Sequence, residues 1–459
     1  MNTRPSVLEV IRGNVEGVDW PLVVRAPVAA LAGLLGVLDT TQWMSQRDII
    51  QRQYAQLVTL TTHLAAQSKQ FKNRLERVGL KPADLGSEDG LRCLPVLRRR
   101  DLQIAPADLF CQNVPQSHRP IGESRTSGAT GQPVTIRRSA VSQLMWRAMN
   151  LRSQISQGTN FAKPCSRIRP QILSYSIQKD QGPPINQLLD TGPMQAIPIT
   201  IDIGQQVAWL AEFKPDNLLV YPTNLEGICR YVRQHQSKIE GLNWIFTIGE
   251  TLTTRVREQA QQILGARVVD KYSSQEVGLI AAECLTSGLY HVMAESLIVE
   301  VLNEDDSPCR AGEIGRVVIT DLHNFATPLV RYEIADYAEV GEACACGRGL
   351  PTLKKILGRQ RNLFIKSDGT RHWPLVGFHQ YRDIAPVIQY QIIQHDLQRI
   401  EVKLVSENPV TTAQEAQLSA VIRAALGFDG GLAFTYFASE IPRSSSGKFE
   451  EFVCLIPAE

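Results

Sequence analysis

The chain has 459 residues, of which 43% are hydrophobic and 20% are charged, and its formal net charge is +2. This composition excludes a disordered chain, a collagen-like chain and a coiled-coil rod. A near-neutral charge balance gives no electrostatic reason to expect a nucleic acid or an anionic membrane as a partner.

The nine cysteines show no dense disulfide spacing, so we expect a reducing, cytoplasmic setting. The first residues lack the apolar region and the cleavage site of a secretory signal. The longest apolar run, residues 28–38, is shorter than the roughly 20 residues that a membrane span needs. We therefore expect neither a signal nor a membrane span, and we interpret this run as a buried helix.

The first hundred residues are predicted to be helical. Residues 46–66 carry apolar side chains close to helical spacing. A second helix is expected around residues 71–78, where Gly79 and Pro82 supply stop signals.

From about Gln171 the pattern changes to short β-type runs that alternate with helical stretches. The β-type runs lie at residues 171–173, 218–220, 244–246 and 267–269. Residues 254–264, between the last two runs, predict a helix. This alternation indicates an α/β fold with parallel strands. Two strand signals with a turn-rich connection, residues 297–302 and 315–320, then predict an antiparallel β subdomain.

The residues from about Gly358 have a pattern of their own. Strands are predicted at residues 390–394, 399–404 and 433–437, and a helix at residues 413–426. A segment of this size can form a small domain. The sequence therefore predicts an α/β fold with a large N-terminal domain of several subdomains, residues 1–358, and a small α+β C-terminal domain, residues 359–459.

The stretch 124–139 is the first candidate binding element. Hydroxyl and glycine residues crowd into six positions, namely Thr126, Ser127, Gly128, Thr130 and Gly131. Small residues let the backbone approach an anion, and N–H groups with hydroxyls can hold phosphate oxygens. The stretch lacks the Lys-Ser/Thr pair of a P-loop. Taken alone, the stretch would be interpreted as a flexible hairpin.

Four further motifs follow in order along the chain. They are Tyr272-Ser273-Ser274-Gln275-Glu276-Val277-Gly278, Pro328-Leu329-Val330-Arg331-Tyr332 ahead of Asp336, Gly358-Arg359, and Pro442-Arg443-Ser444-Ser445-Ser446-Gly447-Lys448. In this order and at these separations the set resembles the adenylate-forming superfamily of acyl-CoA synthetases, luciferases and peptide-synthetase adenylation domains. Within it, the chain is most similar to the phenylacetate–CoA ligase branch. The resemblance covers about residues 94–455.

The resemblance implies ATP-dependent activation of a small carboxylic acid as its adenylate, with release of pyrophosphate and transfer to an acceptor. It implies two catalytic residues: Glu276, which binds Mg²⁺, and Lys448, which bridges the attacking carboxylate and the α-phosphate. Asp336 would accept hydrogen bonds from the ribose, and Arg359 would contact ribose or phosphate. The remaining ATP-binding candidates are Thr126, Ser127, Gly128, Thr130 and Gly131 in the loop, with Glu250, Tyr272, Ser273 and Ser274. Outside such a series, each of these residues would be interpreted as an ordinary turn, helix-end or surface residue.

The chain departs from the family around the predicted hinge. The usual Gly-Arg-x-Asp-Asp reads here Gly358-Arg359-Gln360-Arg361-Asn362, with Gln360 and Arg361 at the pivot of a mobile C-terminal lid. The following loop, residues 366–374, also differs from the usual form in CoA ligases, and Val134 replaces the lysine of the phosphate loop. An aryl or related organic acid with CoA as the acceptor is the first expectation. An amine or a carrier protein as acceptor is the alternative, and a non-catalytic binding or scaffold subunit is less favoured. A homodimer is left open.

Two smaller sets complete the candidates. Cys284, His291, Cys344 and Cys346 make the Cys₃His set of a structural zinc site. The alternative, a group of unrelated buried thiols with a satisfied histidine, is left open. Trp146, Tyr221 and Gly249 are candidates for the acid pocket, although aromatic residues in an apolar context are more often part of the core.

Overall fold

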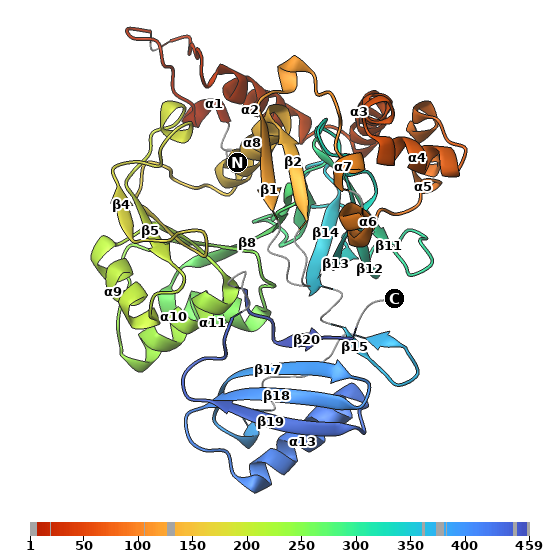
Figure 1. Cartoon of the computed structure of the whole chain (residues 1–459). Coiled ribbons are helices and arrows are strands. Elements are labelled where there is room, and N and C mark those ends of the chain that lie inside the picture. The colour runs from red at the N-terminus through yellow and green to blue at the C-terminus, as the bar shows by residue number, and fades with distance from the viewer. Residues whose placement is uncertain are drawn as a thin grey trace. The chain divides into compact units, whose positions relative to one another are not determined.

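The computed structural model describes residues 7–18, 20–104, 106–125, 134–359, 363–372, 381, 383–443 and 448–456. The chain divides into two compact units, Met1–Leu357 and Gly358–Glu459, which are drawn in Figure 1 and described one after the other below. Both units mix helices and strands, which confirms the predicted α/β class.

Short and long helices form the start of the first unit. They are α1 (Val7–Val10), α2 (Ala29–Thr41), α3 (Gln46–Gln67), α4 (Lys69–Arg77), α5 (Glu88–Arg92), α6 (Arg99–Ile104) and α7 (Pro106–Leu109). The hydroxyl oxygens of Ser45 and Ser68 accept hydrogen bonds from backbone N–H groups in the first turns of α3 and α4. The helices predicted within residues 28–78 are thus confirmed.

Helix α2 differs from its prediction in burial. Leu31, Leu35 and Leu38 are buried, but Val37 on the opposite side is 56% exposed. The expected buried helix is therefore present but is buried on one side only, because that side of α2 packs mainly against helix α8 (Ala140–Ser156).

Two paired strands flank the glycine-rich stretch, one on each side. Strands β1 (Ile121–Arg125) and β2 (Thr135–Ser139) pair in an antiparallel register that joins Arg125 to Thr135. The Ser139 hydroxyl then caps helix α8 by accepting from the N–H of Ser142. The two strands hold together the chain ends that flank residues 126–133.

The centre of the first unit is a twelve-stranded sheet with the order β11-β12-β13-β14-β10-β9-β8-β7-β6-β3-β5-β4 (Figure 1). Its strands are β3 (Cys165–Arg169), β4 (Ser176–Gln178), β5 (Met194–Pro198), β6 (Asn217–Val220), β7 (Trp244–Ile248), β8 (Arg267–Ser274), β9 (Gly278–Glu283), β10 (Tyr290–Val292), β11 (Leu297–Leu302), β12 (Ile314–Asp321), β13 (Tyr332–Val340) and β14 (Thr352–Arg359).

The parallel part of this sheet runs from β5 through β3, β6 and β7 to β8. Helices α9 (Ile203–Phe213), α10 (Pro222–Gln234) and α11 (Thr254–Leu264) lie on one of its faces. Ile168, Leu218, Ile245 and Val268 on the strands pack there against apolar residues of the three helices. The predicted alternation of strand and helix is confirmed.

The strand predicted at residues 171–173 is wrong. The chain leaves the sheet after β3, and the N–H of Ile172 donates to the carbonyl of Arg169 in a turn. Leu173 is 91% exposed. The short run after Pro170 resembles a strand because it contains Ile172 and Leu173. The strand β3 lies earlier in the sequence and contains polar residues.

The remaining strands of the sheet are antiparallel. Strands β11 and β12 pair from Leu297↔Asp321 to Leu302↔Arg316, which confirms the predicted hairpin. A core of residues from these strands, including Val317, Ile319 and Tyr332, continues to Ile280 and Ala281 of β9. The core thus joins the antiparallel part of the sheet to the end of its parallel part.

The second unit contains a four-stranded sheet with the order β19-β18-β17-β20. Its elements are β15 (Phe364–Ile365), β16 (Arg371–His372), β17 (Val387–Asp396), β18 (Arg399–Ser406), α13 (Thr412–Leu426), β19 (Gly431–Phe437) and β20 (Phe452–Cys454). Leu418, Ile422 and Leu426 of α13 are buried in its core. The buried amide of Gln394 accepts from the N–H of Ile365 and donates to its carbonyl, at 3.0 and 2.7 Å, so it joins β15 to β17 as a backbone peptide would.

Within the residues that the structure describes, none of the helices combines the length and the apolar character that crossing a bilayer requires.

Candidate functional site

Two predicted ATP-binding residues that lie 64 positions apart in the sequence are in direct contact. The hydroxyl of Tyr272 in β8 donates a hydrogen bond to Oδ2 of Asp336 in β13 over 2.8 Å. Tyr272 is buried, while Asp336 keeps partial exposure. The tyrosine therefore fixes the orientation of a carboxylate that solvent can still reach.

The turn between β8 and β9 carries Glu276. The Ser274 hydroxyl accepts from the N–H groups of Glu276 and Val277, each at 3.2 Å, which closes the turn. The Glu276 carboxylate is largely buried and lies 3.4 Å from Nη1 of Arg99. Arg138 binds the same turn, because its guanidinium donates to the carbonyl of Gln275. Burial lowers the pKa of Arg138, and the nearby carboxylates of Asp321 and Glu276 oppose that shift.

Tyr221 and Gly249, two of the three predicted acid-pocket residues, are neighbours. They follow the ends of β6 and β7. Gly249 has φ +84°, and a Cβ there would lie 3.0 Å from Cε1 of Tyr221. A side chain at position 249 would therefore be strained by the backbone conformation and crowded by the tyrosine ring. The Tyr221 ring is buried, and burial raises the pKa of its hydroxyl.

Glu250 has a structural partner at the same edge. Its Oε2 accepts from the N–H and from the hydroxyl of Thr223, at 3.0 and 2.8 Å, in the first turn of α10. A carboxylate is stabilised at a helix N-terminus by the orphan N–H groups and by the helix dipole. The ATP contact assigned to Glu250 remains a prediction.

Trp146, the third acid-pocket candidate, is placed differently. It lies on α8 with 43% of its surface exposed. Its ring contacts the turn that holds Glu276, since a Cβ at Gly278 would lie only 2.3 Å from Cδ1 of Trp146. Trp146 therefore covers the β8–β9 turn. Ser273, another predicted ATP-binding residue, lies in β8 close to this turn and is the register partner of Leu279.

The other predicted residues lie in the second unit or outside the described residues. Lys448 is half-buried and precedes Phe449, which packs against Val405 and Ile441. Arg359 ends β14, and its side chain lies outside the part that the structure describes. The same holds for whole residues at the phosphate loop and the hinge, namely Thr126, Ser127, Gly128, Thr130, Gly131, Gln360 and Arg361.

The four predicted zinc ligands come together in space. One ligand atom from each of Cys284, His291, Cys344 and Cys346 lies within 4.8 Å of all the others. Cys284 follows β9, His291 is in β10, and the other two lie between β13 and β14. Burial raises the pKa of the Cys284 thiol, but hydrogen bonds from His291 and from backbone N–H groups lower it by more. The pKa is therefore about 5, below the ordinary value of 9.0.

The cluster has the donor chemistry of a zinc site. Nδ1 of His291 is buried without a hydrogen-bond partner among the described residues. Nε2 of the same ring lies 3.2 Å from Sγ of Cys346, and the sulfurs of Cys344 and Cys284 are 3.7 Å apart. Thiolates and an imidazole in this arrangement suit tetrahedral Zn²⁺. Cys309 lies elsewhere, between β11 and β12, and donates to Asn303.

Three charged residues near these groups were absent from the predicted site. Arg99 and Arg138 contact the Glu276 turn from distant parts of the sequence, so no spacing rule could find them. Lys271 is different, because it directly precedes Tyr272 in β8 and is buried. A lysine between the β-type run at residues 267–269 and the Tyr272 motif was the signal that the sequence offered.

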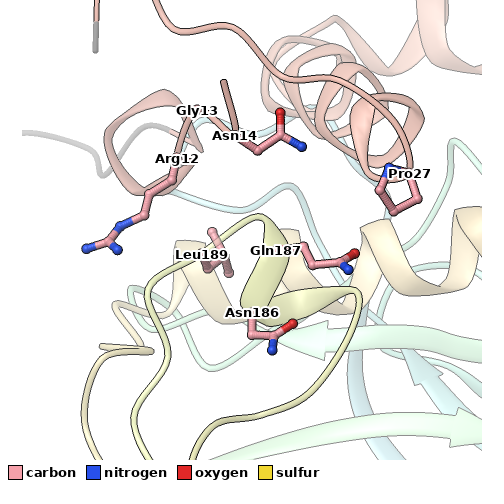
Figure 2. A pocket seen from close by; sticks show the side chains of 7 residues that line it. All are labelled: Arg12, Gly13, Asn14, Pro27, Asn186, Gln187 and Leu189. Atoms are coloured by element: carbon pink, nitrogen blue, oxygen red, sulfur yellow. The ribbon is translucent and has the colours of Figure 1, made fainter. Parts of the chain in front are cut away.

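A cavity of about 370 Å³ lies apart from these residues, between the N-terminal segment and the turn around Asn186 (Figure 2). In Figure 2 the guanidinium of Arg12 points away from the other labelled side chains. Arg12 pairs with Asp190. The cavity is lined by none of the predicted site residues; its lining is Arg12, Gly13, Asn14, Pro27, Asn186, Gln187 and Leu189.

Known proteins resemble the chain over both units. Residues 377–454 match the family described as the CapK C-terminal domain. The chain is 23% identical over 307 residues to a phenylacetate–coenzyme A ligase of Thermus thermophilus, an alignment that covers 64% of this chain and 66% of that enzyme. It is 25% identical over 249 residues to Protein CapK of Staphylococcus aureus, covering 52% of this chain and 53% of that protein.

A solved structure extends the likeness of fold to most of the chain. The 2-hydroxyisobutyryl-CoA ligase in the postadenylation state, in complex with 2-HIB-AMP, superposes with a TM-score of 0.70 at 17% identity over 88% of each chain. In sequence and in fold the chain is similar to the adenylate-forming superfamily, and within it to AMP-forming ligases of the phenylacetate–CoA ligase-like branch.

Similarity to this superfamily gives a common interpretation of the contacts described above. Glu276 and Gly249 follow the ends of β8 and β7, while Tyr272 lies inside β8 and contacts Asp336 in the middle of β13. In α/β sheets, ligands bind in the crevice beyond the carboxyl ends of parallel strands. Glu276 and Gly249 therefore lie where an α/β sheet offers a binding crevice.

Proposed function

We propose that this ligase activates a small organic acid with ATP, releases pyrophosphate and then transfers the acyl group to the thiol of CoA. The observation that carries the proposal is that the Tyr272–Asp336 hydrogen bond and the Glu276 turn lie together, within residues 272–277 at the end of β8. Each was assigned to ATP by resemblance, and their proximity is what a single nucleotide site requires.

In the first half-reaction, a carboxylate oxygen of the acid forms a bond to the α-phosphorus, and the bond to the leaving pyrophosphate breaks. Asp336, held by Tyr272, is positioned to accept hydrogen bonds from the ribose. Glu276 offers a carboxylate that can hold Mg²⁺ shared with ATP phosphates, and this ion would neutralise their charge. Arg99 and Arg138 keep the Glu276 turn in place, since they bind its carboxylate and its backbone.

We assign the two units different tasks. The first unit binds ATP and the acid, and the second carries Lys448 as a lid that pivots at Gln360 and Arg361. A lysine on a mobile unit can bring an ammonium to the α-phosphate for the first step and leave for the second. Binding of Phe449 into the small core with Val405 and Ile441 supports this, because it fixes the base of Lys448 on its unit.

We assign the cysteine–histidine cluster to a structural Zn²⁺. It closes the end of β9 and β10 onto the segment between β13 and β14, and four protein ligands leave no open position for chemistry. The nine cysteines are free of disulfides in the structure, which supports a reducing, cytoplasmic setting.

A pyrophosphate-exchange screen tests the adenylation. Purified protein, ATP, Mg²⁺ and labelled pyrophosphate are combined with a panel of aryl, aliphatic and hydroxy acids. Exchange that depends on one acid class, and that is lost in Asp336→Asn, supports the proposal. Absence of exchange with every acid, together with absence of ATP binding, would favour the non-catalytic alternative.

An amine or a carrier protein is the second candidate for the acceptor. The observations that favour it are the hinge, where Gln360 and Arg361 precede Asn362 in place of the usual acids, and the match of the second unit to the CapK C-terminal domain. Once the acid is known, the adenylating enzyme is supplied with CoA, with amines and with a phosphopantetheinylated carrier protein, and products are identified by mass. Consumption of the adenylate by an amine or carrier but not by CoA would replace the CoA assignment.

A further inference from the structure

One face of the parallel sheet carries cations where the other face is apolar. Arg167, Leu219, Phe246 and Val269 are register partners in one row across β3, β6, β7 and β8. Residues of a strand alternate between faces, and the residues next to these pack against α9–α11. The row therefore lies on the face turned away from the three helices, and Lys271 lies one step further along the same face.

Lys271 is a buried cation without a counter-ion. Its side chain is 5% exposed, and its Nζ lies 4.9 Å from the centre of the Phe246 ring. No carboxylate and no hydrogen-bond acceptor contacts it among the residues that the structure describes. Burial, with repulsion from Arg167, lowers the pKa of Lys271 to about 7. By contrast, the exposed Lys354 pairs with Glu339 at 2.7 Å.

Two arginines on β3 extend the positive charge. Nη2 of Arg167 donates to the amide oxygen of Gln181 over 3.1 Å. The guanidinium of Arg169 lies 5.6 Å from the centre of the Tyr221 ring, and its Nε is buried without a partner. In the described part of the chain, neither arginine has an ion pair.

This arrangement is costly for the free protein. A buried charge without a partner destabilises the fold, and like charges close together add to the cost. Such strain is typically retained where a ligand relieves it. Arg169 lies beside Tyr221, which contacts Gly249, and Lys271 is the register partner of Ile248, the residue directly before Gly249. These are the strand ends where the acid is proposed to bind.

We propose that Lys271, Arg167 and Arg169 form a subsite for a second anionic group, so that the activated acid is dianionic: a dicarboxylic acid, or a carboxylic acid that also bears a sulfonate or phosphate. This proposal rests on the proposed function. One carboxylate is adenylated, and the second anion stays against the three cations and takes no part in the bond changes. Phe246 and Ile248 supply the apolar wall between the two ends of the acid.

Matched acids and matched variants test the subsite. Exchange is measured with glutarate and isophthalate, with their monomethyl esters, and with 3-sulfobenzoate and benzoate. The wild-type enzyme is expected to prefer a dianion over its half-ester or parent acid by at least a hundredfold in kcat/KM. The dicarboxylate and sulfonate arms show which second anion is preferred.

Lys271→Met removes the charge and keeps an apolar stem. We expect it to reduce the preference at least tenfold, chiefly through KM, while Lys271→Arg keeps more of it. Arg167→Gln is the second variant, and Lys163→Met, an exposed lysine before β3, is the control that should leave the preference unchanged. Equal use of half-ester and diacid, or an unchanged preference in Lys271→Met, would overturn the subsite while adenylation stands.

Binding gives a readout that is independent of turnover. Without ATP, millimolar glutarate or isophthalate is expected to raise the Tm of the wild-type protein and not that of Lys271→Met. If no acid supports exchange, the proposed function fails, and this comparison still decides the subsite. Equal shifts for both proteins would refute it.

Discussion

At the scale of single residues, the site combines satisfied and unsatisfied charges. Glu276 and Asp336 each have a partner that orients the carboxylate, Arg99 in one case and Tyr272 in the other. Such partners hold a group in place before the ligand arrives, which is how positioning and electrostatic stabilisation are prepared. Lys271 has no such partner, and its buried charge has consequences for stability as well as for binding.

Lys448→Ala should reduce adenylation by a few powers of ten. One oriented cation can supply several kcal/mol to a transition state whose negative charge spreads over phosphoryl oxygens. ATP affinity should change little, because Asp336 and Glu276, which are assigned to the ribose and to Mg²⁺, are in the other unit. Pyrophosphate exchange and nucleotide binding are measured side by side, with Lys403→Ala of the same unit as the control. Near-native exchange in Lys448→Ala would remove the assignment.

Lys271 should make stability depend on pH in a predictable direction. Its pKa of about 7 in the folded state lies below the ordinary value near 10.5. Between these values the unfolded chain binds the proton and the folded chain does not, so stability rises with pH. The destabilisation is thus complete below pH 7 and disappears above about pH 10.5. Its size is on the order of a few kcal/mol, since each pKa unit is about 1.4 kcal/mol.

Thermal unfolding checks this. Lys271→Met should have a higher Tm than the wild type at pH 6, by a few degrees, and the difference should shrink at pH 9. Lys163→Met should show no such trend. A constant difference at both pH values would mean that Lys271 is already paired.

At the scale of elements, several of the residues to which we assign a function lie near the ends of strands β8 and β9. Strand β8 alone carries Lys271 on one face and Tyr272 on the other, and the turn after it carries Glu276. At the far end of the neighbouring strand β9, Cys284 begins the cysteine–histidine cluster. One antiparallel pair therefore connects the proposed nucleotide site to the proposed metal site.

Protein purified without chelator should contain about one zinc per chain, and Cys346→Ser should lower both zinc content and Tm. The loss follows because a four-ligand site that is missing one thiolate binds metal less tightly, and metal binding contributes to folding. Cys309→Ser, a half-buried thiol outside the cluster, is the control. Elemental analysis and thermal unfolding give the two readouts. A metal-free wild type of undiminished stability would leave only buried thiols.

At the scale of the whole molecule, the chain consists of two units that meet in sequence at residues 357 and 358. The proposed nucleotide residues and Lys448 are in different units. A reaction in two steps can then use two orientations of one unit, which is a common way to separate half-reactions.

Arg361→Pro should impair one half-reaction much more than the other. Proline fixes φ near −65° and so restricts the backbone at the proposed pivot. Pyrophosphate exchange reports the first half-reaction, and single-turnover transfer from preformed adenylate reports the second. Arg361→Ala should leave both nearly intact. Equal losses in Arg361→Pro would indicate general destabilisation or a pivot elsewhere.

Most of the architecture could be predicted because its signals are local. Helical periodicity located α3, and alternation of β-type runs with a helix located β7, α11 and β8. The prediction of a strand at residues 171–173 was wrong because the apolar residues of this run are not buried in a sheet, as the 91% exposure of Leu173 shows. Short runs carry too little periodicity to distinguish a strand from a surface turn.

The site was predictable only in part. Ordered motifs identified Tyr272, Glu276 and Asp336, but their partners Arg99 and Arg138 depend on tertiary contacts over more than a hundred residues. Trp146 covers the turn at Gly278, a contact that spacing along the chain could not reveal. The four metal-ligand candidates did converge, because paired strands bring their two sequence clusters together.

The amide of Gln394 limits where the two units can bend. It fastens Ile365 to β17, so the chain from β15 onward must travel with the second unit. On the other side, β14 holds the chain in the large sheet up to Arg359. Only the few backbone torsions between these two anchors remain to absorb a rotation. The substitution Gln394→Leu would remove the second anchor and lengthen the connection between the two units, without touching any group that is proposed to meet the substrate.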